Sequence, residues 1–223
     1  MTYPGGKNAA GVAQRIINHM PPHKTYLEMF LGSGAILRNK RPAETNIGID
    51  KSQKALDLCS DLAVRPFSHC MIIGCGIEYL RNHFCAFGPT ALIYCDPPYM
   101  PETRKGGDLY DYEMTEADHK MLLRVLKSTD AMVMISGYRC PLYDRVLKDW
   151  HRIDYKAQTR RGMVDENLWM NFQPPNELHD YSFLGANYRE RDNIKKKQKR
   201  LKARLQKMPR LELLAIMEVM NSI

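Results

Sequence analysis

An acid, two prolines and a tyrosine end an apolar run in the middle of the chain, where residues 92–100 have the sequence LIYCDPPYM. Neither proline has a backbone N–H to donate to a neighbouring strand, so a strand must end before them. Asp96 is therefore expected at the carboxyl end of a buried strand, the edge where open α/β sheets bind ligands. A strand followed by an ordinary turn would have the same sequence, so the decision depends on other segments.

Two earlier segments place glycines or a carboxylate at the ends of other strands. Residues 28–35 have the sequence EMFLGSGA, and glycines between a strand and a helix let backbone N–H groups approach an anionic ligand. Asp50 ends the next apolar segment, and a carboxylate there typically binds the ribose hydroxyls of a nucleoside cofactor. A tight turn and a helix-capping aspartate explain each feature singly, but three strand ends in this order favour a ligand site.

Segments of strand and helix type alternate along the chain, which predicts an α/β fold with a mixed, mostly parallel sheet and helices on both faces. Strands are expected at residues 24–30, 45–52, 69–76, 90–95 and 131–136. Helices are expected at residues 8–19, 35–40, 53–62, 77–85, 114–127 and 141–149. Residues 151–159 and 166–172 are predicted to form a closing antiparallel pair, joined by a polar loop at 160–165.

Length and composition favour a globular α/β protein and argue against a membrane protein or a disulfide-stabilised one. The 223 residues suit one α/β domain with an appendage. No apolar run approaches the ~20 residues of a membrane span, and residues 1–20 lack the apolar core of a signal peptide, so we expect a soluble, intracellular protein. The six cysteines form no C-x-x-C pair and no His-Cys ligand spacing, so neither a metal site nor a disulfide framework is expected.

The positive charge is concentrated near the C-terminus. Residues 187–210 contain eleven lysines and arginines and two acids, a charge of +9 against +8 for the whole protein, so the remainder is at −1. Such a block is either a solvated helix face or a contact for a polyanion. The sequence therefore predicts a domain at 1–186 and a basic helical extension at 187–223, whose apolar residues leave a homodimer through these helices open.

Four segments, taken in order, resemble the motifs of the Dam-like, D12-class adenine-N6 DNA methyltransferases. They are Tyr3-Pro4-Gly5-Gly6-Lys7, residues 28–35, Asp50 and Asp96-Pro97-Pro98-Tyr99. The resemblance covers roughly residues 1–172, and residues 135–138 (ISGY), residues 168–169 (LW) and the tail are similar to those of small phage and prophage members. It implies a Rossmann-like S-adenosylmethionine-dependent methyltransferase fold, S-adenosylmethionine as cofactor with S-adenosylhomocysteine as product, double-stranded DNA as partner, and the cytoplasm of a bacterial or phage-infected cell.

The residues of the tetrad suit this chemistry. An exocyclic adenine amine is a poor nucleophile because its lone pair is delocalised into the ring. Asp96 and the carbonyl of Pro97, held rigidly by Pro98, can each accept one N6–H, so that catalysis rests on positioning and electrostatics. Tyr99 can stack on the target base, which must leave the duplex to reach it. The resemblance places the following residues around the cofactor: Tyr3, Lys7, Glu28, Phe30, Gly32, Ser33, Gly34, Asp50 and Cys75.

The chain departs from the family at two places. Cys75 stands where the family usually has an aspartate that binds the cofactor's adenine, and a thiol is a weak acceptor. Larger members insert a target-recognition domain before the catalytic strand, and only fifteen residues separate Cys75 from Ala91. DNA contacts are therefore expected from the loop at 100–113, from residues 157–186 and from the tail. The basic residues expected at DNA are Arg104, Lys105, Lys195, Lys196, Lys199 and Arg200.

The leading hypothesis is a site-specific DNA methyltransferase that acts on N6 of a flipped-out adenine. Methylation of adenine N6 in RNA or of cytosine N4 in DNA keeps the same chemistry, and a catalytically silent nucleic-acid-binding subunit is a third hypothesis. Asp96 in the tetrad favours adenine over cytosine, and the intact Gly32-Ser33-Gly34 argues against a silent subunit. The target sequence, a restriction partner and the choice between DNA and RNA stay open.

Overall fold

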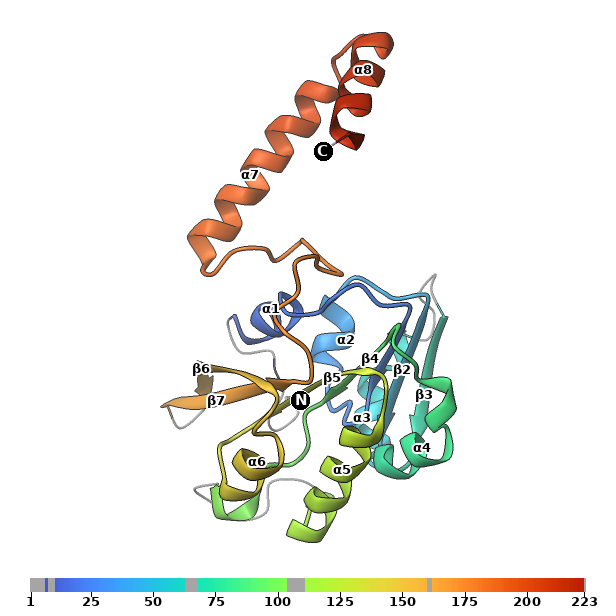
Figure 1. Ribbon diagram of the computed structural model, residues 1–223, viewed down its shortest axis with the longest axis vertical. Helices are drawn as coiled ribbons and strands as arrows, with labels where there is room; N and C mark the ends of the chain where they lie inside the picture. Colours follow the sequence, from blue (N-terminus) through green and yellow to red (C-terminus); the bar gives the residue numbers. More distant parts are fainter. Residues whose placement is uncertain (1–6, 8–10, 63–67, 104–110, 160–161, 223) are drawn as a thin grey trace. The chain divides into compact units, whose positions relative to one another are not determined.

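The computed structural model describes residues 7, 11–62, 68–103, 111–159 and 162–222. The chain divides into two compact units, Met1–Asp180 and Tyr181–Ile223. The first unit contains a sheet flanked by helices, and the second contains two helices joined by a short turn (Figure 1).

Seven strands form one sheet in the order β3-β2-β1-β4-β5-β7-β6, in which β1 to β5 are parallel and β7 is antiparallel to both of its neighbours, β5 and β6. The bounds are β1 Thr25–Glu28, β2 Thr45–Asp50, β3 Ser68–Ile73, β4 Ala91–Cys95, β5 Met132–Gly137, β6 His151–Thr159 and β7 Gly162–Met170. The chain runs outward from β1 to β3 and then returns to β4 on the other side of β1. The strand order therefore changes direction between β1 and β4, the place where open α/β sheets bind ligands.

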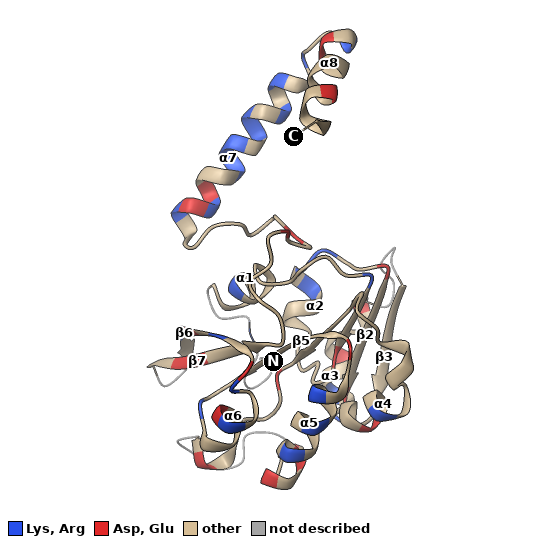
Figure 2. Ribbon diagram, viewed as in Figure 1, with Lys and Arg blue, Asp and Glu red and all other residues tan. Residues whose placement is uncertain are grey.

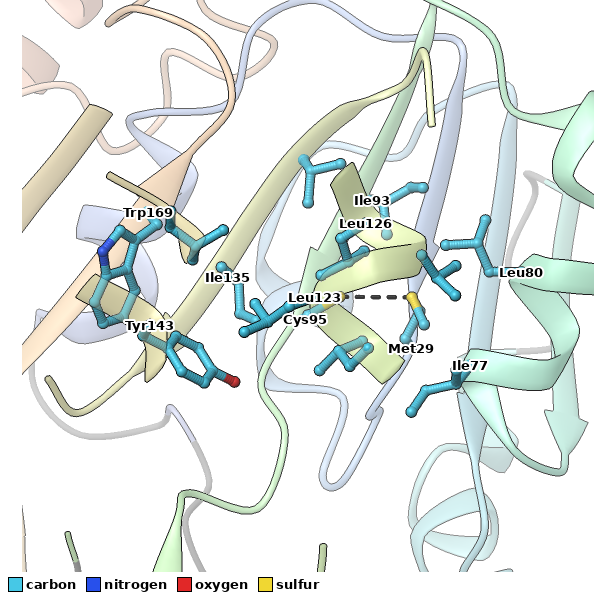
Figure 3. Packing of buried hydrophobic residues seen from close by; sticks show 14 of the residues in the cluster. Met29, Ile77, Leu80, Ile93, Cys95, Leu123, Leu126, Ile135, Tyr143 and Trp169 are labelled. Atoms are coloured by element: carbon cyan, nitrogen blue, oxygen red, sulfur yellow. Dashed lines mark hydrogen bonds between the residues drawn. The ribbon is translucent and has the colours of Figure 1, made fainter. Parts of the chain in front are cut away.

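Side chains of the central strands alternate between the two faces of the sheet. On one face, Leu27, Ile93 and Ile135 share an apolar core with helices α4 (Gly76–Asn82), α5 (Glu116–Ser128) and α6 (Pro141–Val146), as Figure 3 shows in part. The other face includes the fully buried rings of Tyr26 and Tyr94. Helices α1 (Val12–Ile17) and α2 (Ala35–Asn39) pack beside each other, and α3 (Gln53–Leu58) contacts β2 and β3. Both faces of the sheet are thus covered.

Local sequence explains where the longest helix of this unit begins. Thr115 caps α5 by accepting a hydrogen bond from the backbone N–H of Asp118, and the Asp118 carboxylate accepts one from the backbone N–H of Thr115. This reciprocal pair satisfies two N–H groups that the first turn would otherwise leave unpaired. Pro141 occupies the first turn of α6, where its missing N–H costs nothing.

The structure confirms the predicted alternation of strands and helices within the described residues, with one correction. The polar loop predicted at 160–165 is wrong, because β7 already begins at Gly162 and pairs with β6 along its whole length. Lys156 lies opposite Asp165, and their side chains form an ion pair of 2.6 Å. Exposed polar side chains on this end of the hairpin made a strand resemble a loop. Residues 8–10 of the first predicted helix lie outside the described part.

The second unit contains α7 (Tyr188–Leu205) and α8 (Arg210–Asn221). Asn187 caps α7 by accepting a hydrogen bond of 3.0 Å from the backbone N–H of Glu190. Lysines and arginines recur along α7 (Figure 2), whereas most of α8 is apolar and exposed. The basic helix and the short apolar helix predicted from the sequence are therefore both present. Neither these helices nor the other described ones combine the length and apolar character that crossing a membrane requires.

Candidate active site

A cavity of about 260 Å³ opens at the carboxyl ends of β1, β2 and β4. Nine residues singled out from the sequence line it: Lys7, Glu28, Phe30, Gly32, Ser33, Asp50, Cys75, Asp96 and Pro98. These residues come from five separate segments, and the parallel strands bring their ends to the same edge. Gly34 and Pro97 follow the same strand ends but do not line the cavity, and Tyr99 lies just beyond it.

The first two strand ends are joined by the carboxylate of Asp50. Its Oδ2 accepts a hydrogen bond of 2.8 Å from the backbone N–H of Gly32, and its Oδ1 accepts one of 2.8 Å from the backbone N–H of Ser52. Gly32 and Gly34 have φ values of 51° and 64°, in the left-handed region that favours glycine. Burial raises the pKa of Asp50, although these backbone donors act in the opposite direction.

The residues that follow β3 line the cavity without an acidic side chain: they are Gly74, Cys75 and Gly76. Cys75 is half-buried at the start of α4, and Gly76 follows it against the backbone of Met29. A Cβ atom on Gly76 would lie 2.5 Å from the carbonyl oxygen of Met29, so only glycine fits. Four carboxylates that the sequence did not single out for this site also line the cavity: Glu78, Asp111, Glu113 and Asp118. Several acids therefore belong to the lining of the cavity, although Cys75 stands in the usual position of the aspartate.

Asp96, Tyr99 and Lys7 meet at the end of β4. The Lys7 ammonium lies 2.9 Å from Asp96 Oδ1 and donates a hydrogen bond to the Tyr99 hydroxyl. The Tyr99 hydroxyl in turn donates to Asp96 Oδ1 at 3.2 Å. Within the described residues, neither Asp96 Oδ2 nor the carbonyl oxygen of Pro97 accepts a hydrogen bond. Two acceptor atoms of the tetrad thus have no donor in the part of the chain that the structure describes.

Burial and charge set the protonation of this group. Burial raises the pKa of Asp96, and the nearby Glu166 carboxylate adds to this, whereas Lys7 and the Tyr99 hydroxyl oppose it. Burial alone would lower the pKa of Lys7, but Asp96 and Glu166 outweigh it, so the pKa of Lys7 is raised and the side chain stays charged. Burial also holds the pKa of the Tyr99 hydroxyl well above its ordinary value, so it remains a donor. The ring of Tyr138 meets the ring of Tyr99 at 62°, with centroids 4.5 Å apart.

Glu28 lines the cavity, but its carboxylate is already bonded inside the domain. Oε2 accepts hydrogen bonds from the Tyr26 hydroxyl at 2.9 Å and from the backbone N–H of Leu37 at 3.1 Å. Burial raises the pKa of Glu28 to about 8. The acid is therefore protonated at neutral pH and supports the start of α2.

Glu166 and Tyr155 belong to the site although neither was singled out from the sequence. Glu166 Oε2 lies 3.3 Å from the Lys7 ammonium and accepts a hydrogen bond of 3.0 Å from the Tyr155 hydroxyl. The one local indication is an acid at the beginning of an apolar strand segment, because an acid on a buried face needs a partner.

Several predicted contact residues are not among the described residues of the first unit. Tyr3, Arg104 and Lys105 lie outside the described residues. The basic residues Lys195, Lys196, Lys199 and Arg200 belong to α7 in the second unit. Their contribution to binding stays a prediction.

Comparison with known proteins agrees with this site. Residues 86–161 match the model of a family described as D12 class N6 adenine-specific DNA methyltransferase, which confirms the resemblance over that segment. The matched segment contains the Asp96-Pro97-Pro98-Tyr99 tetrad and the strands β4 and β5, which precede and follow it. No curated protein matches the chain.

Solved structures share the fold at low sequence identity. A proposed RNA methyltransferase from Pyrococcus horikoshii is 16% identical with a TM-score of 0.51, over 75% of this chain and 85% of that one. TrmN from Thermus thermophilus is 17% identical with a TM-score of 0.50, over 74% of this chain and 49% of that one. Spermidine synthase from Thermotoga maritima is 13% identical with a TM-score of 0.51, over 83% and 70%. The fold is the Rossmann-like fold of S-adenosylmethionine-dependent methyltransferases.

S-adenosylmethionine is the cofactor of this methyltransferase, and the cavity fits it. The left-handed φ of Gly32 turns the loop so that backbone, with no Cβ, faces the space beside Asp50. Met29 and Ile77 provide an apolar wall, and Asp50 provides a carboxylate at the second strand end. These are the surfaces that an adenosine with a charged amino-acid chain requires.

Proposed function

We propose that this methyltransferase acts on N6 of an adenine that has been flipped out of double-stranded DNA. The observation that supports this most directly is a pair of acceptors at the edge of the cofactor cavity, Asp96 Oδ2 and the carbonyl oxygen of Pro97, which no donor among the described residues occupies. An exocyclic amine has two N–H bonds, so it matches two acceptors. The match of residues 86–161 to an adenine-specific family supports the same base.

In the proposed reaction, Asp96 and Pro97 orient the amine. Each accepts one N6–H, so the lone pair of nitrogen points away from the ring system. When bound, S-adenosylmethionine would supply an electrophilic methyl group to N6, and its sulfur would keep the electron pair of the broken carbon–sulfur bond. The proton that N6 then loses passes to Asp96 Oδ2. Lys7 holds the other carboxylate oxygen in place, so most of the rate enhancement comes from positioning and electrostatics.

Tyr99 is proposed to stack on the flipped base. Its hydroxyl is fixed by Lys7 and Asp96, and the edge of the Tyr138 ring supports its aromatic face. Because the Tyr99 ring is already fixed before the base binds, stacking costs it little conformational entropy. A base that stacks on Tyr99 must leave the duplex, since Asp96 lines the cofactor cavity and is not reached by a base within the stack.

We propose that the cofactor is held by the first three strand ends. Asp50 binds the ribose hydroxyls, and the Gly32-Ser33-Gly34 loop approaches the methionine part. Phe30 and Cys75 contribute walls of the cavity, while Glu28 acts from inside the domain through Tyr26 and Leu37. This assignment differs from the sequence prediction at two residues, because Lys7 joins the catalytic group and the Glu28 carboxylate supports the domain.

Residues 187–223 are proposed to form a basic helical extension that binds phosphates along the duplex. The exposed side chains of Lys195, Lys199 and Arg200 lie on α7, whose charge is strongly positive. Such contacts give affinity without sequence information. The target sequence would then be recognised by the first unit.

We further propose that α8 pairs with α8 of a second copy. Leu211, Leu214 and Met217 are 81%, 50% and 49% exposed, and a helix that is apolar on several faces is normally covered. α8 begins with Arg210 and carries Glu218 near its end, so an antiparallel pair places opposite charges together. α7 is too basic to pair with itself, which leaves α8 as the contact.

A methyl-transfer assay tests the substrate. The protein is incubated with tritiated S-adenosylmethionine and with matched duplex DNA, single-stranded DNA and structured RNA, and labelled bases are identified after digestion. We expect label in N6-methyladenine from duplex DNA, and we expect Asp96→Ala to abolish transfer while cofactor binding falls far less. Label confined to RNA or to cytosine N4 would replace the proposed substrate, and an Asp96→Ala variant with a tenth of normal turnover would remove Asp96 from catalysis.

A further inference from the structure

Lys7 is held between two carboxylates, of which the buried Glu166 does not belong to the tetrad. Its ammonium lies 2.9 Å from Asp96 Oδ1 and 3.3 Å from Glu166 Oε2. The side chains of Lys7 and Glu166 are 6% and 8% exposed, so water contributes little to solvating either charge. A buried ammonium adopts such a place only where acceptors fix it.

The antiparallel end of the sheet explains how Glu166 reaches the site. β7 pairs with β5 up to Asn167, opposite Gly137, at the carboxyl end of β5. Glu166 is the next residue outward, so it lies at the same edge as the end of β4. Tyr155 is its cross-strand partner on β6 and donates a hydrogen bond of 3.0 Å to Oε2. Two strands outside the parallel part of the sheet thus orient one carboxylate towards Lys7.

We propose that Glu166 is a positioning residue for methyl transfer, which holds the Lys7 ammonium so that Asp96 keeps Oδ2 turned to the amine and retains its strength as an acceptor. The inference rests on the proposed reaction at Asp96 and adds a residue to it. Without Glu166, Lys7 is free to move onto Asp96 and occupy both oxygens. With Glu166, the ammonium is shared and bonds Oδ1 alone.

The charges support this arrangement. Lys7, Asp96 and Glu166 together carry −1, whereas Lys7 and Asp96 alone would be neutral. A site with a net negative charge attracts the positive charge of the bound methyl donor, and it also stabilises the positive charge that develops on N6 as the new bond forms. Because the group is buried, a single carboxylate has a large effect on its neighbours.

The same charges predict a measurable pH dependence. The titratable and charged groups that interact with Asp96 are the following: Lys7, Glu28, Tyr94, Cys95, Tyr99, Tyr138, Tyr143, Tyr155 and Glu166. Among them, Glu166 raises the pKa of Asp96 and Lys7 lowers it. Asp96 must be ionised to accept N6–H, so the acidic limb of the kcat profile follows its pKa. Removing the charge of Glu166 therefore moves that limb to lower pH.

The test uses the full-length protein with Glu166→Gln, which keeps the size and one acceptor but removes the charge. We expect kcat to fall about ten- to a hundredfold, the range for a misplaced reacting group, with the KM for S-adenosylmethionine changed less than threefold. The acidic limb should move down by about one pH unit. Asp165→Asn is the matched control, because Asp165 is the adjacent residue, faces outward and pairs with Lys156. The control should retain normal kcat and an unchanged limb.

A second variant separates charge from position. Glu166→Asp keeps the charge but withdraws it by one methylene group, so kcat should fall while the acidic limb stays nearer that of the unaltered protein. This variant also decides the matter if Glu166→Gln does not fold. Normal kcat in Glu166→Asp, or a lower kcat in Glu166→Gln without a shifted limb, would overturn the proposal.

The role of Glu166 can be tested separately from the proposed function. If the unaltered protein methylates none of the nucleic acids, the function is wrong. The pKa of Asp96 can then be measured without a substrate, from the pH dependence of its carboxyl carbon resonance. A lower Asp96 pKa in Glu166→Gln than in Asp165→Asn supports the proposal, and equal values overturn it.

Discussion

The backbone N–H of Gly32 donates a hydrogen bond of 2.8 Å to Oδ2 of Asp50, so the ends of β1 and β2 are linked through one carboxylate. Oδ1 of the same carboxylate accepts from the backbone N–H of Ser52 at 2.8 Å. Asp50 is thus a scaffold for the loop as well as a candidate ligand for ribose. A substitution there has consequences both for the loop and for the cofactor.

Asp50→Ala should weaken S-adenosylmethionine binding by roughly 1–3 kcal/mol, the range for losing a charge-assisted hydrogen bond to a buried partner. Calorimetric titration measures the change in Kd. Asp50→Asn is the control for the scaffold, because its amide oxygen still accepts from Gly32. An unchanged Kd in Asp50→Ala would mean that the residue only supports the loop.

Gly76→Ala should destabilise the fold, because the new Cβ would lie 2.5 Å from the carbonyl oxygen of Met29. Forcing a methyl group into packed backbone typically costs about 1–3 kcal/mol. The free energy of unfolding in urea measures the change. Gly88→Ala is the matched control, since a Cβ at Gly88 meets no atom within 4 Å. Equal stability of the two variants would contradict the predicted steric clash.

Glu28 should make the folded protein less stable as the pH rises from 5 to 7. Burial raises its folded pKa to about 8, whereas the unfolded carboxyl has its ordinary value of 4.5. In this window the folded state binds the proton and the unfolded state has released it, so stability falls by roughly 1.4 kcal/mol per pH unit. The stabilisation that protonated Glu28 contributes is fully present below the pKa of the unfolded carboxyl, 4.5. It is lost as the pH rises towards and through the folded pKa, about 8.

Glu28→Gln isolates this contribution, because the amide retains an acceptor for Tyr26 and cannot ionise. The buried His23, whose pKa is lowered to about 3 by burial above all, acts in the opposite direction but is common to both proteins. Between pH 5 and pH 7, the unaltered protein should therefore lose roughly 1–3 kcal/mol relative to the variant. Parallel unfolding curves at pH 5 and pH 7 give the comparison, and equal losses in both proteins would contradict it.

Reversal of three charges on α7 should weaken DNA binding and flatten its salt dependence. The variant replaces Lys196, Lys199 and Arg200 by Glu, and the slope of log K against log salt should decrease by roughly 0.9 for each phosphate that the variant no longer binds. Sequence preference should change little, because phosphate contacts position the protein rather than specify a sequence. Binding titrations at several salt concentrations measure both quantities.

The control for α7 replaces Lys120, Arg124 and Lys148 by Glu. Each set changes the charge equally and contains one lysine in an i, i+4 ion pair, Lys196 with Asp192 at 2.6 Å and Lys120 with Glu116 at 2.7 Å. If both variants show the same decrease in affinity and slope, the effect is one of total charge and α7 is not a specific DNA-binding element. If neither changes, the first unit binds the DNA.

Pairing through α8 should make the protein a dimer that dissociates on dilution. Arg210→Glu and Glu218→Arg should each weaken the dimer, and the double variant should restore it, because the antiparallel arrangement brings the two charges together. Sedimentation at several concentrations measures the equilibrium. Met163→Ser removes an exposed methionine of β7 and should leave it unaltered. A monomer at all concentrations would rule the pairing out.

The sequence predicted the parts of the site that directly follow apolar strand segments. Gly32, Asp50 and Asp96 follow directly from apolar segments, and parallel strands must bring their ends to one edge. The partners of those residues were not predictable in the same way. Lys7 was placed at the cofactor by resemblance, but its contacts with Asp96 and Glu166 depend on how β7 and the N-terminal segment meet. Long-range contacts of single side chains leave no local pattern.

The order in which these three residues occur along the chain has a consequence during synthesis. Lys7 leaves the ribosome first, Asp96 follows with β4, and Glu166 emerges last with β7, after the strands that form the cofactor cavity. A nascent chain that stops before β7 contains the residues of that cavity and the tetrad, but it has no Glu166 to share the Lys7 ammonium. Such a fragment also lacks Leu168, Trp169 and Met170 of β7, which are fully buried in the whole protein. Translation past the final hairpin is therefore the step that completes both the sheet and the group formed by Lys7, Asp96 and Glu166.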